Sequence, residues 1–529
     1  MTAAASGALV FAAACGGDDG DDSSASTEGN GEQPQKGGHF GFYTAPSENF
    51  NVVSNYYEGT RLAGVNVYDR LLTTRFDDRR YVLEAAESVE QPDPTTVIAK
   101  LQPNLVYQNR APVNGRPVIT EDIVADQAYV KQLASAFSRS FQVDFLERAE
   151  ATDTRTIVFR LKKPNPYLFG TNQLGNATSQ AIIPREMLPN LDTAEPIGSG
   201  PYYLDAVQLN SRYLYKRSES YRGAGKSLPY IDEREVIMMT DAVAQEAAFR
   251  SGQIHVWIPT PGAFDRVVKE MGSSVVVESA PGQGVFASYL NLTRTPWSDI
   301  RVREAIYRST DRQQIVDLVF QGQAVVPPGP VPAGLPAYQL DPKDTAQYYA
   351  LDLNKAKQLL SAANVDLGKE YDVICSTSSA TNQQAAEVWA QQLSKVGLKL
   401  RIQSYPFAEW IKRITSSEYD AIMGGSPGDD TPQRALRLQH TNSQVQLKFM
   451  GLNDPTIDAL IEKSEETSDI DENVKLVKQI ELELLKRYAG VNMLLTQQEN
   501  WLRSPKLKNY DFQPNLALAQ YQTEMWLQS

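Results

Sequence analysis

The chain has 529 residues, of which 42% are hydrophobic and 22% are charged, and its formal net charge is −13. This length favours about three domains, and the composition is that of a globular protein with enough apolar surface for a large core. The acidic balance argues against nucleic-acid binding, because phosphate recognition needs clustered Lys and Arg side chains.

The first residues are typical of a secretion signal. Residues 3–14 are almost all small or apolar. The stretch is too short for a bilayer, which needs about 20 residues, but it fits the apolar core of a signal peptide. Ala12-Ala13-Ala14-Cys15-Gly16 then resembles a bacterial lipobox, with Ala12 where Leu is usual and no basic segment before it. We therefore expect residues 1–15 to be a signal peptide with lipidation at Cys15; a disordered alanine-rich tail is the alternative.

The next segment predicts a flexible tether. Residues 16–36 are mostly Gly, Asp, Ser, Glu, Gln and Asn, so they cannot bury a core. A flexible coil of this length reaches roughly 25 Å. A lipidated cysteine and such a tether would hold a globular body outside the cytoplasm, anchored to the cell membrane as a lipoprotein. No later segment is apolar enough to cross the bilayer.

The body of the chain mixes strands and helices. Short runs rich in β-branched or aromatic residues predict strands at 38–43, 96–101, 156–161 and 398–402. Apolar residues at three- and four-residue steps predict helices at 301–319, 353–362, 382–396 and 471–489. We interpret their apolar stripes as core packing, including Val302, Ile315 and Leu318 in the first helix. The mixture indicates an α/β architecture with several lobes.

Motifs for catalysis or metal binding are weak. Gly424-Gly425-Ser426-Pro427-Gly428 matches the G-x-S-x-G elbow of serine hydrolases, but Pro427 has no N–H to donate to an oxyanion. The chain has no Walker loop and no dinucleotide fingerprint, and its histidines, His39, His255 and His440, lack metal-ligand spacing. The two cysteines, Cys15 and Cys375, lie in different contexts and are not expected to pair. We expect no catalytic residue, no metal and no cofactor.

Several short segments follow one another in an order that is informative about the family. They are Asn114–Val118 with Thr120–Ile123, Pro196–Tyr202, Tyr221–Gly223 with Leu228–Asp232, Ala248–Ile254, Asp299–Ala305 with Asp311-Arg312, and Asn354–Leu360. Together they resemble extracellular solute-binding proteins of family 5, the peptide-, nickel- and oligosaccharide-binding class of bacterial ABC importers. Asn114 and His255 stand where this family usually has Asp. We interpret most of these residues as structural, with Gly and Pro setting turns and Arg and Asp fixing helix ends.

The resemblance implies a fold and a domain plan. It implies an α/β, two-lobed periplasmic-binding-protein fold with an extra domain inserted in the first lobe. Solute would bind in the cleft between lobes, which close around it. The expected parts are lobe I at 37–57, 193–285 and 497–529, the extra domain at 58–192, and lobe III at 286–496.

The resemblance also implies a solute contact in lobe III. In peptide binders of the family, a Y-D…G-W-x-G-D stretch supplies an Asp that pairs with the α-ammonium group of the peptide. Here Tyr419-Asp420 is followed by Gly425-Ser426-Pro427-Gly428-Asp429 at matching offsets, so Asp429 is the candidate amine anchor, in one loop with Gly425 and Ser426. Ser426 replaces the family's Trp, which removes an aromatic wall. Asp430 competes with Asp429 for the role, and two solvated loop acids are the alternative.

Other candidate contacts rest on position alone. Ser47 and Glu48 follow the first strand, where lobe I of the family touches its ligand. Tyr107 follows a segment of the extra domain, and Trp410 lies upstream of the Asp429 loop. The loop 377–381 precedes the helix around Trp389. For each aromatic residue, core packing is the alternative.

The leading hypothesis is a receptor for short peptides that works as a monomer with ABC permease and ATPase subunits. A receptor of the same fold for an oligosaccharide or another organic solute is the main alternative, and a sugar site would need several aromatic stacking faces. A secreted hydrolase or a surface adhesion or signalling protein is more remote, since no motif links His440 to Ser426 as a base. Nickel fits only if it arrives already chelated, because histidines are so few.

Overall fold

The computed structural model describes residues 33–44, 49–53, 58–74, 81–133, 141–170, 173–175, 180–377, 379–426, 428, 431–441, 452–510, 512 and 523–529. They fall into two compact units. Unit 1 comprises the described residues up to Pro259 with Val268–Glu278 and Trp501–Ser529, and unit 2 comprises Thr260–Val267 and Ser279–Asn500. The expected signal peptide, lipobox and most of the tether lie outside the described residues. The division of unit 1 into lobe I and an extra domain stays a prediction.

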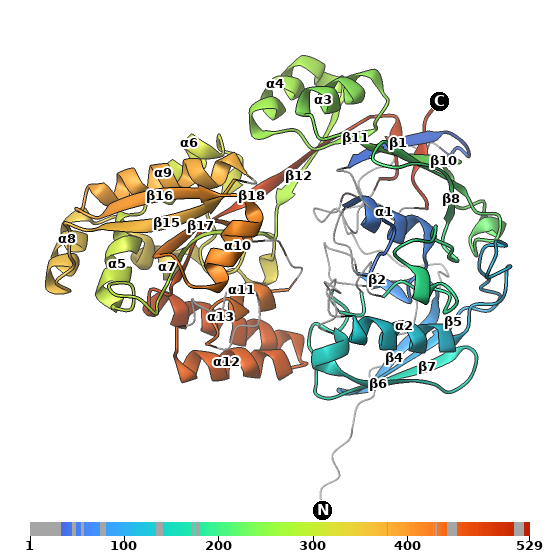
Figure 1. The fold of residues 1–529 in the computed structure, drawn as a ribbon, viewed down its shortest axis with the longest axis horizontal. Coiled ribbons are helices and arrows are strands. Elements are labelled where there is room, and N and C mark those ends of the chain that lie inside the picture. The colour runs from blue at the N-terminus through green and yellow to red at the C-terminus, as the bar shows by residue number, and fades with distance from the viewer. Residues whose placement is uncertain are drawn as a thin grey trace, which may run out of the picture. The chain divides into compact units, whose positions relative to one another are not determined.

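Unit 1 contains two four-stranded sheets (Figure 1). One has the order β1-β10-β9-β8, with β1 parallel to β10 and the other pairs antiparallel. The other is the antiparallel sheet β4-β5-β7-β6. The strands are β1 (His39–Thr44), β4 (Ala86–Asp93), β5 (Thr96–Leu101), β6 (Leu146–Ala151), β7 (Thr156–Leu161), β8 (Tyr202–Gln208), β9 (Arg212–Arg217) and β10 (Glu233–Met238).

Short elements complete unit 1. Two small pairings join β2 to β3 and β19 to β20, and β11 pairs with the end of β18. The elements are α1 (Glu58–Val67), β2 (Leu72–Thr74), β3 (Tyr81–Leu83), α2 (Thr120–Gln132), α3 (Ala242–Ser251), β11 (Val256–Trp257), β19 (Leu507–Lys508), β20 (Trp526–Leu527), and short 3-10 or π turns at Phe141–Phe145, Leu188–Asn190, Ala224–Lys226 and Gly272–Ser274.

Glycines in the recognised segments have the structural roles that the sequence analysis expects, in turns and at close contacts between backbones. Asn114 and Gly115 both have positive φ, 55° and 70°, which makes the tight turn before Arg116. Arg116 then binds Asp122 at 2.7 and 2.8 Å, at the start of α2. Gly198 lies so close to Val67 that a Cβ atom would collide with the Val67 carbonyl oxygen. The interpretation of these segments as structural is confirmed here.

Unit 2 is built around one mixed sheet with the order β18-β13-β17-β15-β16. Strand β15 runs parallel to both of its neighbours, β16 and β17, whereas β13 runs antiparallel to β17 and β18. The strands are β12 (Val276–Pro281), β13 (Val285–Leu290), β14 (Ala324–Val325), β15 (Glu370–Ser376), β16 (Lys399–Tyr405), β17 (Ala421–Ser426) and β18 (Val491–Arg503). The chain passes between the units within β12 and β18, which pair with each other.

Helices cover both faces of this sheet (Figure 1). One face is packed by α5 (Ile300–Ser309), α6 (Arg312–Val319), α8 (Leu353–Ala362) and α9 (Ala380–Ser394), and the other by α10 (Phe407–Thr415) and α11 (Gln433–Arg437). The other helices are α4 (Pro261–Met271), which crosses between the units, α7 (Pro342–Tyr349), α12 (Pro455–Glu466) and α13 (Ile470–Lys486), with a 3-10 turn at Pro336–Tyr338. No described helix is long and apolar enough to cross a membrane.

The predicted elements at 96–101, 156–161 and 353–362 are confirmed at their bounds, and those at 38–43, 398–402, 382–396 and 471–489 within a few residues. The single helix expected at 301–319 is wrong, because the chain breaks it into α5 and α6. Asp311 caps α6 by accepting from the Gln314 N–H at 3.0 Å. Leu318, expected in the core, is 64% exposed.

Candidate functional site

Three parallel strands of unit 2 end at one edge of its sheet. In the register of β15 and β16, Ser376 lies opposite Tyr405, and β17 runs parallel to β15 on the other side and ends at Ser426. The antiparallel β13 begins at the same edge, since Val285 lies opposite Ser426. We call this edge, where the three parallel strands end, the carboxyl edge of unit 2.

The connections that leave the carboxyl edge diverge. Successive side chains of a strand point to opposite faces, and both faces here are apolar. Val373 and Cys375 of β15 pack in one cluster with Trp389 of α9. Ile374 of β15 packs in another cluster with Ile414 of α10, so α9 and α10 cover opposite faces of the sheet (Figure 1).

The segment that follows β17 leads to α11, whose Ala435 belongs to the α10 cluster. Between β15 and β17 the chain therefore turns to opposite faces, first into α9 and then toward α11. In open α/β sheets, ligands bind outside the carboxyl ends of the strands at such a switch point. This geometry, which lies wholly within unit 2, makes the carboxyl edge the best-supported candidate site.

Small and polar residues line the centre of this edge. Gly425 is exposed, and a Cβ atom there would make only ordinary contacts, with Phe286 Cδ2 at 3.6 Å and the Val285 carbonyl oxygen at 3.8 Å. Its neighbour Gly424 lies against the buried Asn382, with a hypothetical Cβ 3.5 Å from the Asn382 side chain. Asn382 Nδ2 donates to the Ser376 carbonyl at 3.3 Å, which ties the first turn of α9 to the end of β15. The backbone is thus open to a solute at Gly425 and braced behind it.

Hydroxyl groups dominate the loop 377–381. Ser379 Oγ and Thr381 Oγ1 lie 2.6 Å apart. Ser379 is the N-cap of α9, yet its side chain makes no capping hydrogen bond. The Thr377 N–H donates to the Tyr405 carbonyl at 2.9 Å, which joins the ends of β15 and β16.

Two aromatic rings of α10 stand beside the carboxyl edge. Ile414 anchors the helix in the core, and Trp410 is partly buried against the same cluster. Phe407, at the first turn, is 58% exposed, and its ring centroid lies 5.7 Å from that of Trp410. Trp410 Nε1 has no hydrogen-bond partner in the described part of the chain. Trp410 therefore packs partly into the core, its role as a solute contact stays a prediction, and Phe407 is a residue that the motif-based reasoning missed.

Of the remaining predicted solute contacts, one is buried in the core and the others lie wholly or partly outside the described residues. Tyr107 of unit 1 is 0% exposed within the core, its ring 4.9 Å from the Arg116 guanidinium, and burial raises the pKa of its hydroxyl well above the usual value. Its ring therefore offers no face to solvent. Ser47, Glu48, Asp429 and Cys15 lie outside the described residues, and only the backbone of Ser426 is described. The roles proposed for those residues stay predictions.

The histidines serve in local contacts. His255 Nδ1 accepts from the Gly41 N–H at 3.1 Å, and burial lowers the pKa of His255 to about 4. His440 is 2% exposed, with Nε2 at 3.3 Å from Glu462. Among the described residues, no group of three His, Cys, Asp or Glu side chains could hold a metal ion.

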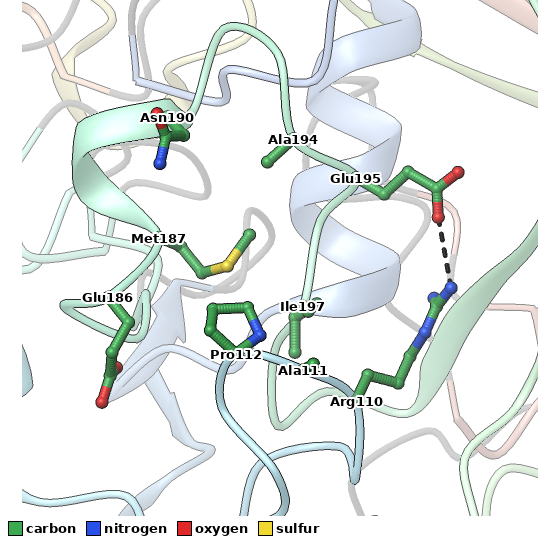
Figure 2. A pocket seen from close by; sticks show the side chains of 9 residues that line it. All are labelled: Arg110, Ala111, Pro112, Glu186, Met187, Asn190, Ala194, Glu195 and Ile197. Carbon is green, nitrogen blue, oxygen red and sulfur yellow. Dashed lines mark hydrogen bonds and ion pairs between the residues drawn. The ribbon is translucent and has the colours of Figure 1, made fainter.

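Unit 1 contains a cavity of about 210 Å³ on its surface (Figure 2). Met187 and Ile197 form an apolar floor, and Asn190 stands at the rim. The charged rim groups Arg110 and Glu195 pair with each other at 3.2 Å. At this volume the cavity is below the range of ordinary ligand pockets. None of the predicted site residues lines it.

Comparison with known sequences identifies the family to which the chain is similar. The model of the bacterial extracellular solute-binding proteins, family 5 Middle, matches residues 80–445. The dipeptide-binding protein of Escherichia coli K12 is 26% identical over 301 residues, covering 54% of this chain and 54% of that protein. Heme-binding protein A of Haemophilus influenzae is 25% identical over 300 residues, covering 56% of this chain and 53% of that protein. The chain spans about half the length of the relatives it matches.

Solved structures share the fold over almost the whole chain. The periplasmic binding protein DppA of Helicobacter pylori, in complex with the peptide STSA, superposes with a TM-score of 0.75 at 19% identity, covering 94% of this chain and 99% of that one. NikA of Brucella suis, in complex with Fe(III)-EDTA, gives a TM-score of 0.77 at 20% identity, covering 93% and 100%. The two-lobed periplasmic-binding-protein fold is thereby confirmed.

Proposed function

The chain belongs to the bacterial extracellular solute-binding proteins, family 5, and on that premise we propose that it is the receptor of an ABC importer that captures short peptides outside the cytoplasm. The family consists of binding proteins rather than enzymes, in line with the expected lack of catalysis. Relatives named for dipeptides and for di- or tripeptides support the peptide class.

The observation that carries the proposal is the carboxyl edge of unit 2. It combines a switch point between β15 and β17 with an exposed glycine and hydroxyl-rich turns. A peptide needs such backbone groups, because its own N–H and C=O groups must find partners when they leave water.

In the proposed mechanism, Asp429, four residues after Gly425 in the chain, pairs with the peptide's α-ammonium group, and Gly425 and Ser426 contact the adjoining backbone. Ser47 and Glu48 would contribute from lobe I. Capture would follow from closure of the lobes, which a solute favours only as far as it binds the closed state better than the open one. The permease and ATPase subunits would then recognise the closed form.

The proposed location follows from the first 36 residues. Cleavage before Cys15 and transfer of a diacylglycerol to its thiol would leave a lipid at the N-terminus, with residues 16–36 as tether. Labelling with a radioactive fatty acid tests this step, and a Cys15→Ala protein that still takes up the label would contradict it.

A second candidate is a receptor of the same fold for an oligosaccharide or another organic solute. The exposed ring of Phe407 beside Trp410 favours it, because aromatic faces at a site edge stack on flat solutes or on the apolar face of sugars. The replacement of the family's Trp by Ser426 counts against a peptide site of the usual kind, which would keep that wall, but it adds no stacking face for a sugar.

Native mass spectrometry of the protein from Lys36 onward, before and after unfolding and refolding, tests the proposal. A heterogeneous added mass that fragments as short peptides would support the peptide receptor and give the length range. A single discrete non-peptide mass would replace it with the second candidate. If no mass is retained, isothermal titration with mixtures of di- to pentapeptides and with oligosaccharides decides, and binding of sugars alone would overturn the peptide assignment.

A further inference from the structure

A proline-rich segment of unit 2, residues 327–335, lies across the strands that carry the chain between the units. We call it the strap. Its sequence, Pro-Pro-Gly-Pro-Val-Pro-Ala-Gly-Leu, leaves few backbone N–H groups, because proline has none. Most of the strap is nonetheless buried, so the few remaining N–H groups must secure it.

Two of those groups bind the crossing strands. The Ala333 N–H donates to Thr496 Oγ1 of β18 at 3.0 Å. The Gly334 N–H donates to the carbonyl of Gly282, directly after β12, at 3.0 Å. Gly334 approaches so closely that a Cβ atom there would collide with the Gly282 carbonyl oxygen. The strap therefore touches both strands through which the chain leaves unit 2.

The third group binds an acid. The Val331 N–H donates to Glu481 Oε2 of α13 at 2.9 Å, and a Cβ atom on Gly329 would collide with the same oxygen. Glu481 is 0% exposed, and its other oxygen, Oε1, has no partner among the described residues. An amide side chain could accept the Val331 N–H equally well, so the carboxyl group adds one property, which is that it can ionise.

Among the residues that the structure describes, no cation is paired with this carboxyl group. Lys478, on α13 itself, lowers the pKa of Glu481, but by less than burial raises it. From α7 the hydroxyl of Tyr349 faces it, and the strap carries no titratable side chain. The Tyr338 hydroxyl, just after the strap, lies 3.3 Å from Asn473 Oδ1. Glu481 is therefore neutral when buried at mildly acidic pH, and its charged form gains from contact with water.

We propose that Glu481 makes the strap a pH-sensitive latch on the two strands that carry the chain between unit 1 and unit 2. With Glu481 protonated, the strap stays docked on β18 and on the Gly282 loop. When Glu481 ionises, opening of the strap lets the carboxylate reach water, which frees both strands. The inference rests on unit 2 alone and does not depend on the solute.

The direction follows from linkage. Burial raises the pKa of Glu481 from 4.5 to about 8. The docked strap then binds more protons than the open one, so docking is most stable below about pH 4.5 and loses stability as the pH rises to about 8. Over that range the opening constant rises by up to about ten-fold per pH unit.

Hydrogen–deuterium exchange of the whole chain between pH 6 and 8, corrected for the intrinsic exchange rate, tests the latch. The protection of a peptide that covers 329–335 should fall about ten-fold or more in the natural sequence. In Glu481→Gln, which keeps the acceptor for Val331, it should stay constant with pH. In Glu472→Gln, an exposed change on the same helix, it should follow the natural protein.

A pH dependence that is the same in the natural protein and in Glu481→Gln would overturn the latch, as would constant protection in both. If Glu481→Gln does not fold, the natural protein decides by itself. The strap peptide must then lose protection faster with pH than a peptide from the central strand β15, and equal loss in the two would contradict the proposal.

Discussion

Two regions of unit 2 handle polar groups in opposite ways. Around Arg303 and Arg312, in a segment that resembles the family, every guanidinium contact goes to the framework. Arg303 donates to the carbonyls of Tyr488 and Ser298 at 2.8 and 2.7 Å, and Arg312 to that of Met493 at 3.0 Å. At the carboxyl edge, Gly425 and Phe407 are exposed and contact little.

The difference teaches which residues a family motif marks. The recurring Arg and Asp side chains hold helix ends and strand carbonyls, because buried acceptors must be satisfied. The residues that can meet a solute are small or exposed, and they follow the strands whose order the framework fixes. Substitutions in the first region should therefore change stability, and those in the second should change binding.

The largest expected effect is in the framework. Arg312→Ala should lower the free energy of unfolding by about 3 kcal/mol or more, since it leaves the Met493 carbonyl and Asn492 Oδ1 buried without a donor and opens a cavity beside Tyr349. Urea denaturation measures it. The control is Arg301→Ala on the exposed side of α5, which is expected to change the free energy of unfolding far less. Equal losses would mean that burial does not separate the two arginines.

A smaller but binding-specific effect is expected from the proposed amine anchor. On the proposed function, Asp429→Ala should weaken binding of a free-amine peptide by about 2 kcal/mol or more, and N-acetylation of the peptide should do the same. Asp430→Ala is the matched control for the register. Isothermal titration calorimetry gives the affinities. If both Asp429→Ala and N-acetylation leave affinity intact, Asp429 is not the amine anchor.

Phe407→Ala should separate binding from stability. Because the ring is 58% exposed, its loss should change the free energy of unfolding by only about 0.5 kcal/mol. If the ring contacts solute, affinity should fall by about 1 kcal/mol. Trp410→Ala, which removes a partly buried ring from the α10 cluster, should by contrast cost stability as well. A Phe407→Ala protein with unchanged affinity for every solute tried would remove α10 from the site.

The smallest expected effect concerns Cys375, whose thiol should not react with alkylating reagents in the folded protein. It lies one residue before the carboxyl edge, yet it is 0% exposed, and burial raises the pKa of its thiol to about 12. In protein from Lys36 onward it is the remaining cysteine, so alkylation by iodoacetamide at pH 8 should proceed only after unfolding. Rapid modification of the folded protein, read by intact mass, would show that the edge opens as far as β15.

The sequence by itself determined several strands and helices and the role of the recognised segments. Period-two and helical patterns placed β5, β7 and α8 at their bounds, since local burial of alternate residues sets them. It failed at 310–311, where the side-chain cap of Asp311 starts a new helix inside a continuous apolar stripe. The apolar pattern also predicted that Leu318 is buried in the core, whereas its side chain is exposed in the fold.

Only the tertiary structure decided which residues gather at one place. Gly425, Asn382 and Phe407 come from three segments, and they meet at one sheet edge because β17 and β16 lie on opposite sides of β15. Nothing local in the sequence encodes that order. The same holds for Tyr107 and Glu481, whose burial depends on elements far away in the chain. Sequence patterns report what a residue's neighbours in the chain require, whereas burial and proximity depend on contacts across the whole fold.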